Sequence, residues 1–111
     1  QPFDLKLEIT PSIGSTSEDV LYLDFESLEF PLRLSHWKSG DYFYPSGMSG
    51  KKKLSKYFKD EKLSLIDKEN TLVIYSGDAV VWIVGRRADQ RFIATKNSPK
   101  FLKLSIEHAH S

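Results

Sequence analysis

The stretch TLVIYSGDAVVWIVG, residues 71–85, decides the fold class of this chain. Two runs rich in β-branched and aromatic residues, 71–76 and 79–84, flank the pair Gly77-Asp78, which is typical of a two-residue hairpin turn. Both runs are almost wholly apolar, so we expect a β-hairpin at 71–84 whose two faces are both buried.

Shorter segments on either side of the hairpin also have strand character. Leu5, Leu7 and Ile9 alternate with polar residues, as in a strand with one buried face. Further strands are expected at 20–25, 32–37, 91–95 and 101–106. The chain therefore reads as α+β and mostly β.

Helical spacing occurs in only two places. Leu54, Tyr57 and Phe58 fall at i, i+3 and i+4, which predicts a helix at about 51–61, with Ser49 as a plausible N-cap. A second short helix is expected at about 64–69.

Composition indicates a folded domain. A chain of 111 residues with 40% hydrophobic and 13% aromatic residues is large enough to bury a core. It has no cysteine, which excludes disulfides and thiolate metal ligands and fits a reducing compartment. No apolar run approaches the length of a membrane span. The N-terminus has no methionine and no signal-peptide pattern, so we expect a fragment of a longer protein.

The net charge of +1 conceals a strong asymmetry along the chain. Residues 1–30 contain one lysine and seven acidic residues, whereas residues 31–62 contain eight basic and three acidic residues. A basic segment in the middle of the chain points to an anionic partner.

The most basic part of that segment is GMSGKKKLSKYF, residues 47–58. It is not a P-loop, because Pro45 stands at the first glycine position and Lys52 at the hydroxyl position of that motif. Lysines are unfavourable in the first turn of a helix, where the peptide dipoles form a positive pole. A phosphate bound there would reverse that cost. The residues alone leave two interpretations open, an anion site or a solvated basic face.

Arg86, Arg87 and Arg91 follow the hairpin and form a second basic group. They suit phosphate or ribose contacts, or surface ion pairs with Asp89 and nearby acids. Four aromatic residues near the basic loop suit either base stacking or, more commonly, a core: Trp37, Tyr42, Phe43 and Tyr44.

No pattern of catalytic or metal-ligating residues is found. His36, His108 and His110 do not make a ligand set, and Asp60-Glu61 fits the solvated end of a helix better than an acid–base pair. The residues by themselves indicate a binding module without catalytic or metal-binding residues.

The segments 31–65 and 79–95 resemble the C-terminal domain of bacterial tRNA(Ile)-lysidine synthase, particularly the form found in Bacteroidetes. The resemblance spans residues 32–104. The matching residues are Trp37, Gly40, Asp41, Phe43, Pro45, Gly47, Met48, Gly50, Lys52, Lys53, Leu54 and Ser55, then Val81, Trp82, Val84, Gly85, Arg87, Arg91 and Phe92. Family members often carry arginine at the positions of Ser35 and Tyr42, and aspartate at that of Lys56.

The resemblance implies a compact β-sandwich-like module, of a type that also occurs in the β subunit of phenylalanyl-tRNA synthetase. The whole enzyme would be a cytoplasmic ligase that joins lysine to the wobble cytidine of a CAU-anticodon tRNA(Ile), using ATP and Mg²⁺. Catalysis would belong to an N-terminal domain with an S-G-G-x-D-S loop, which is missing from this sequence. This domain would grip the tRNA acceptor stem and be inactive alone.

On this interpretation, residues 1–30 are acidic strands or a linker, 31–106 form the tRNA-binding domain and 107–111 are a frayed tail. The expected tRNA contacts are Lys51, Lys52, Lys53, Lys56, Arg87, Arg91 and Arg33, with no catalytic or metal residue. The expected structural motif is Trp37, Gly40, Asp41, Pro45, Gly47, Gly50 and Leu54. The alternative is a docking module that binds protein, including the N-terminal domain of its own chain, without touching RNA.

Overall fold

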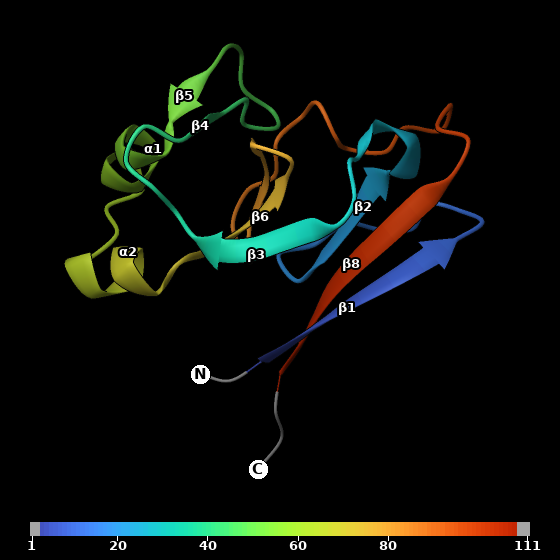
Figure 1. Ribbon diagram of the computed structural model, residues 1–111, viewed down its shortest axis with the longest axis horizontal. Coiled ribbons are helices and arrows are strands. Elements are labelled where there is room, and N and C mark those ends of the chain that lie inside the picture. The colour runs from blue at the N-terminus through green and yellow to red at the C-terminus, as the bar shows by residue number, and fades with distance from the viewer. Residues whose placement is uncertain (1–2, 109–111) are drawn as a thin grey trace. The chain divides into compact units, whose positions relative to one another are not determined.

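The computed structural model describes residues 3–108, which form mostly β-strands with two short α-helices (Figure 1). The strands are β1 (Phe3–Thr10), β2 (Val20–Asp24), β3 (Leu32–His36), β4 (Tyr42–Phe43), β5 (Lys52–Lys53), β6 (Leu72–Ser76), β7 (Ala79–Ile83) and β8 (Phe101–His108). The α-helices are α1 (Leu54–Asp60) and α2 (Leu65–Asn70), and Phe25–Ser27 forms a 3₁₀ turn. The prediction of a mostly β chain with two short helices is confirmed.

The chain divides into two compact units, with one boundary between residues 28 and 29 and with residues 92–106 grouped with the N-terminal segment instead of with residues 31–91. One unit combines residues 1–28 with 92–111, and the other consists of residues 29–91. We call these the terminal unit and the central unit. The acidic N-terminal segment therefore shares a unit with the C-terminal strand.

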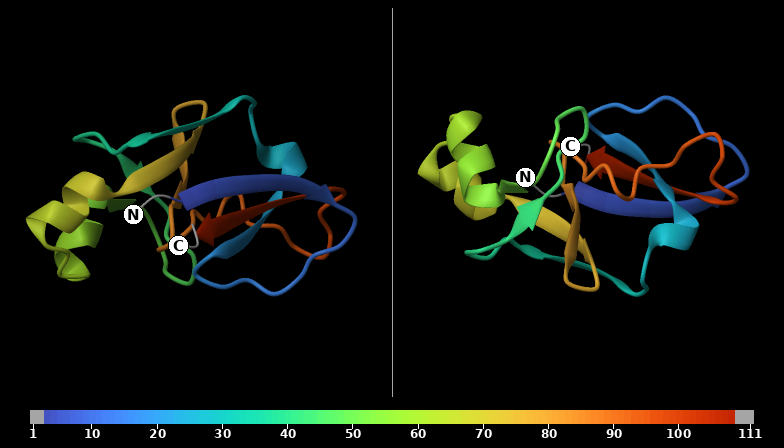
Figure 2. Two further views of the ribbon diagram at one scale, coloured as in Figure 1. Left: turned by 90° about the horizontal axis from the view of Figure 1, so that it is seen from below. Right: turned by 90° about the horizontal axis from the view of Figure 1, so that it is seen from above.

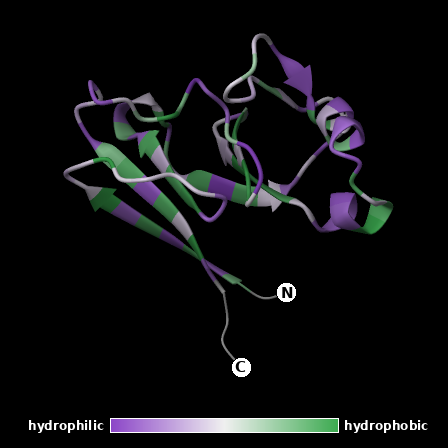
Figure 3. Ribbon diagram, turned by 180° about the vertical axis from the view of Figure 1, so that it is seen from behind, coloured by the Kyte–Doolittle hydropathy of each residue, from purple (hydrophilic) through white to green (hydrophobic). Residues whose placement is uncertain are grey.

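The terminal unit contains one antiparallel sheet of order β1-β8-β2, with β8 in the middle (Figure 1). Leu104 of β8 lies opposite Leu7 of β1 and Leu21 of β2, so these leucines share one face. Hydrophobic and hydrophilic bands alternate along these strands (Figure 3), as the sequence of β1 predicts. Leu104 is fully buried, whereas Leu7 on the edge strand is 49% exposed.

Two expectations at the C-terminal end are wrong. Residues 91–95 do not form a strand, because within this segment only Ile93 makes a β-bridge, to Leu23. Residues 107 and 108 are not frayed, since β8 reaches His108, where it pairs with Phe3. The rest of the expected tail, 109–111, lies outside the described residues.

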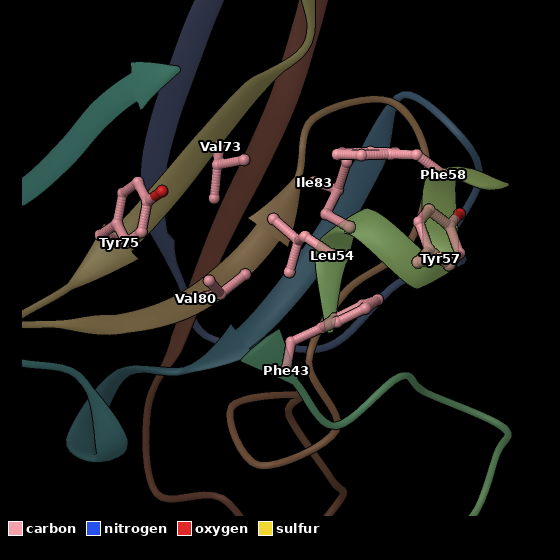
Figure 4. Packing of buried hydrophobic residues seen from close by; sticks show 8 residues of the cluster. All are labelled: Phe43, Leu54, Tyr57, Phe58, Val73, Tyr75, Val80 and Ile83. Atoms are coloured by element: carbon pink, nitrogen blue, oxygen red, sulfur yellow. The ribbon is translucent and has the colours of Figure 1, made fainter. Parts of the chain in front are cut away.

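The central unit is built on a sheet of order β3-β6-β7. The predicted hairpin is confirmed: Ser76 pairs with Ala79 across the turn, where Gly77 has a φ of 58° that suits glycine. From Val73 to Ser76 and from Val80 to Ile83 every residue is buried. Figure 4 shows how β4, α1 and the hairpin supply the core, whose members are Phe43, Leu54, Tyr57, Phe58, Val73, Tyr75, Val80 and Ile83.

The helix α1 begins later than expected. Lys52 and Lys53 pair with Phe43 and Tyr42, and Lys53 is the N-cap residue, without a capping bond from its side chain. The lysines therefore precede the helix instead of occupying its first turn, and Ser49 is not the cap. Strand pairing with a distant segment overrides the local helical pattern here.

The second helix agrees with its prediction to within one residue. The Ser64 hydroxyl accepts the N–H of Asp67 at 3.0 Å and so caps α2. Both views in Figure 2 show α1 and α2 next to each other.

Candidate nucleic-acid interface

The two-stranded sheet formed by β4 and β5, here called the β4–β5 ribbon, has one buried and one exposed face. Tyr42 lies opposite Lys53, and Phe43 lies opposite Lys52. Because side chains alternate along a strand and paired residues share a face, Tyr42 and Lys53 lie on one face and Phe43 and Lys52 on the other. Phe43 is completely buried, whereas Tyr42 is 44% exposed. The two lysines of β5 therefore point in opposite directions.

Lys52 and Lys56 converge on a single carboxylate. Lys52 Nζ lies 2.6 Å from Oδ2 of Asp60, and Lys56 Nζ lies 3.1 Å from its Oδ1. Hydrogen bonds from Lys52 and then Lys56 lower the pKa of the Asp60 carboxyl below its ordinary value. Asp60 thus holds both lysines in place and offsets part of their charge, a role that sequence reasoning missed.

Two tyrosine rings lie in a row beside the exposed face, with a cation against the ring at each end. The Nζ of Lys51 lies 4.6 Å from the centre of the Tyr42 ring, and Tyr42 meets Tyr44 edge-to-face at 6.2 Å. The Cζ of Arg91 in turn lies 4.4 Å from the centre of the Tyr44 ring. Each contact is attractive, because the face of an aromatic ring is electronegative.

A hollow of about 420 Å³ lies beside the ribbon. It is lined by Lys51, Lys52, Lys53 and Lys56, with Pro45 and Gly50 among the other lining residues. We call it the lysine hollow. The structure brings together all four lysines that the sequence singled out: Lys52 and Lys53 lie in β5, Lys51 directly precedes it and Lys56 lies in the first turn of α1. A cavity lined by several lysine residues favours an anionic ligand.

The arginines of the predicted site are used within the fold. Arg91 forms two side-chain contacts with the fully buried carboxylate of Asp89, Nε–Oδ1 at 3.0 Å and Nη2–Oδ2 at 2.9 Å. This pairing raises the pKa of Arg91. Arg87 Nη1 donates to the carbonyl of Ser46 at 2.8 Å, and Arg33 lies 4.3 Å from the centre of the Tyr75 ring. None of these three lines the lysine hollow.

Asp89 is the second residue that sequence reasoning undervalued, since it was treated only as a surface partner for the arginines. Its carboxylate also accepts the N–H of Tyr44 at 2.9 Å, and its backbone forms a β-bridge with Pro45. It therefore positions the segment that leads into the lysine hollow. The short spacing to Arg91 was the available signal, but burial could not be read from it.

The predicted structural motif surrounds the same loop. Trp37 Nε1 donates to the carbonyl of Lys68 at 3.0 Å, and its ring meets Phe58 edge-to-face. The Asp41 carboxylate accepts the hydroxyl of Tyr75, and its carbonyl accepts the N–H of Leu54 at 3.0 Å. Burial, reinforced by this hydrogen bond, raises the pKa of Tyr75. Gly40, Gly47 and Gly50 have positive φ values.

Two further findings concern residues 3–108. No group of three or more histidine, cysteine, aspartate or glutamate side chains in this range is arranged to hold a metal ion. Nor is any helix in this range long and apolar enough to span a membrane.

Comparison with known proteins agrees with the resemblance seen in the sequence. The family model described as "TilS substrate C-terminal domain" matches residues 32–106. A tRNA(Ile)-lysidine synthase of Parabacteroides distasonis is 52% identical over 83 residues, which are 75% of this chain and 19% of that protein. The namesake of Bacteroides thetaiotaomicron is 37% identical over 86 residues, 77% of this chain and 20% of the relative.

A solved structure described as the crystal structure of a TilS C-terminal domain shares the fold. It superposes with a TM-score of 0.83 at 20% identity, covering 98% of this chain and 86% of the other. This chain spans about a fifth of the length of the curated relatives it matches. On the strength of the family match over residues 32–106, the chain belongs to the TilS substrate C-terminal domain family.

Proposed function

We propose that this chain is the tRNA-binding part of a tRNA(Ile)-lysidine synthase. The whole protein would attach lysine to the wobble cytidine of CAU-anticodon tRNA(Ile) in the cytoplasm, with ATP and Mg²⁺ held by an N-terminal catalytic domain. The relatives carry that enzyme's name, and the segment that this chain matches is about a fifth of their length. This sequence lacks the S-G-G-x-D-S loop, so no step of the chemistry is assigned to its residues.

The single observation that carries the proposal is the lysine hollow. Four lysine residues line one cavity of about 420 Å³, a concentration of positive charge that suits phosphates of an RNA backbone. Lysine contacts to phosphates and riboses of an A-form stem read shape and position instead of sequence. The acceptor stem of the tRNA is the proposed partner.

The four lysines contribute unequally to this proposal. Asp60 already engages Lys52 and Lys56, whereas Lys53 Nζ has no ion-pair partner among residues 3–108. Lys51 and Lys53 flank the exposed ring of Tyr42. We therefore assign the main phosphate contacts to Lys51 and Lys53. Arg33, Arg87 and Arg91 shape the surface through their contacts within the fold.

Binding of an acceptor-stem hairpin RNA, measured by fluorescence anisotropy at several salt concentrations, tests the proposal. The double variant Lys51→Ala/Lys53→Ala should weaken binding and lower the slope of log K against log salt by about one for each lysine. The charge-matched control is Lys59→Ala/Lys96→Ala, two exposed lysines that do not line the hollow. Equal losses in the two double variants, or affinity that ignores salt, would contradict the proposal and favour the protein-docking alternative.

A further inference from the structure

Tyr42 lines one hollow of the central unit and contacts a lysine that lines another. Its ring contacts Lys51 Nζ at 4.6 Å, and Lys51 lines the lysine hollow. Tyr42 itself lines a second hollow of about 300 Å³, together with Arg91, Asp41 and Asp78. One exposed aromatic ring thus lines the second hollow and is linked to the lysine hollow through Lys51.

The second hollow does not suit a phosphate. Its lining has two acidic residues, Asp41 and Asp78, which repel an anion at short range, and one cation, Arg91, whose guanidinium is already paired with Asp89. Carboxylates instead accept hydrogen bonds from amino groups, such as those on the edges of cytosine and adenine. Oδ2 of Asp41 already accepts the Lys38 N–H and the Tyr75 hydroxyl. Asp78, in the exposed hairpin turn, makes no hydrogen bond or ion pair with residues 3–108 and is the available acceptor.

The ring of Tyr42 is held in place before any ligand arrives. Strand pairing with Lys53 fixes its backbone, and the edge-to-face contact with Tyr44 supports its side chain. Tyr44 is in turn covered by Arg91, whose guanidinium is held by the buried Asp89. A ring that is already ordered loses little conformational entropy when a partner stacks on it.

We propose that Tyr42 stacks an unpaired, amino-bearing nucleobase in the second hollow while the lysine hollow holds a neighbouring phosphate. This inference rests on the proposed function and deepens it, since it adds a single-stranded nucleotide to the duplex ligand. Stacking on aromatic side chains is how proteins hold unpaired bases of RNA. Asp78 accepts the exocyclic amino group, so cytosine or adenine binds better than uracil, which has no such group.

The test compares three hairpin RNAs that share one stem. The first has a blunt end, the second has a short single-stranded cytosine extension, and the third has a uracil extension of equal length. We expect the cytosine extension to tighten binding about ten-fold over the blunt hairpin, in the range of one stacked base. Tyr42→Ala should remove that gain, so that the variant binds the cytosine-extended and blunt hairpins equally. Tyr42→Phe should keep the gain, and Asp78→Asn should narrow the preference for cytosine over uracil.

The control for losing an exposed apolar side chain is Leu34→Ala, because Leu34 is 47% exposed and Tyr42 is 44% exposed. It should leave all three affinities unchanged. If the blunt hairpin binds and the cytosine extension does not raise its affinity, the stacking inference is overturned and the proposed function stays intact. If the blunt hairpin is not bound, the proposed stem contact fails. In that case Tyr42-dependent binding of the extended RNA still supports the inference, and its absence overturns it.

Discussion

The buried carboxylate of Asp89 grips the guanidinium of Arg91 through two parallel contacts, at 3.0 and 2.9 Å. The same carboxylate accepts the backbone N–H groups of Tyr44, at 2.9 Å, and of Arg91 itself, at 2.8 Å. One side chain therefore joins the segment after β4 to the segment after β7. The junction holds Tyr44 directly, and Tyr42 indirectly through its edge-to-face contact with Tyr44.

Replacing Asp89 with asparagine should destabilise the chain strongly. The change keeps a similar shape but removes the charge that satisfies four donors, so the expected loss is about 2–4 kcal/mol. Urea denaturation measures it. Asp78→Asn, on the exposed turn, should change stability by less than about 0.5 kcal/mol. Equal losses of stability from the two substitutions would show that burial of Asp89 does not determine its contribution to the stability of the fold.

The ion pairs of Asp60 should disappear in acid. Its pKa is lowered in the folded state, so its contribution to stability is present above the ordinary value of 3.8 and is lost as pH falls through the folded value. In an NMR titration, Lys52→Ala should raise the pKa of Asp60 more than Lys56→Ala does, because Lys52 is the larger cause. Lys59→Ala, the control, should leave that pKa unchanged.

Asp60 should also limit the affinity for RNA. Asp60→Asn releases Lys52 and Lys56, so we expect hairpin binding to tighten and the salt slope to steepen by about one or two. Glu69→Gln makes the same change of charge on α2, away from the hollow, and serves as the control. Unchanged or weaker binding by the Asp60 variant would mean that the two lysines do not contact phosphate.

Tyr75 should resist ionisation. Burial, then the hydrogen bond to Asp41, raises its pKa above the ordinary 10.0, so the associated stability is present below that value and is lost as pH rises beyond it. Asp41→Asn should lower the Tyr75 pKa only partly, because burial remains. NMR chemical shifts of the Tyr75 ring carbons, followed as the pH is raised into the alkaline range, measure this pKa. A normal Tyr75 pKa in the unsubstituted chain would contradict the packing described.

The elements that could be predicted from the sequence are those that depend on residues close together along the chain. The hairpin at 71–84 was predictable because its turn and its apolar runs are contiguous, and α2 because Ser64 caps it locally. The start of α1 was not, since it depends on β5 pairing with β4 from across a loop. Likewise residues 91–95 have strand composition but pair only through Ile93.

The candidate site divides in the same way. The lysine cluster was visible as a run of residues, and the structure does gather it around one hollow. Which lysine points where was not visible, because that depends on the alternation of β5 against Phe43. The partners chosen by Asp60 and Asp89 follow from tertiary placement, which no local pattern records. The roles of the lysines and arginines in RNA binding stay predictions.

The order of the first sheet has a consequence during protein synthesis. Because β8 lies between β1 and β2, neither of these early strands can complete its pairing until residues 101–108 have left the ribosome. The central unit is contiguous in sequence and can fold as it emerges. Until β8 follows, β1 and β2 have unpaired edges. The seven acidic residues among the first thirty make N-terminal segments of different nascent chains repel one another, which opposes their aggregation.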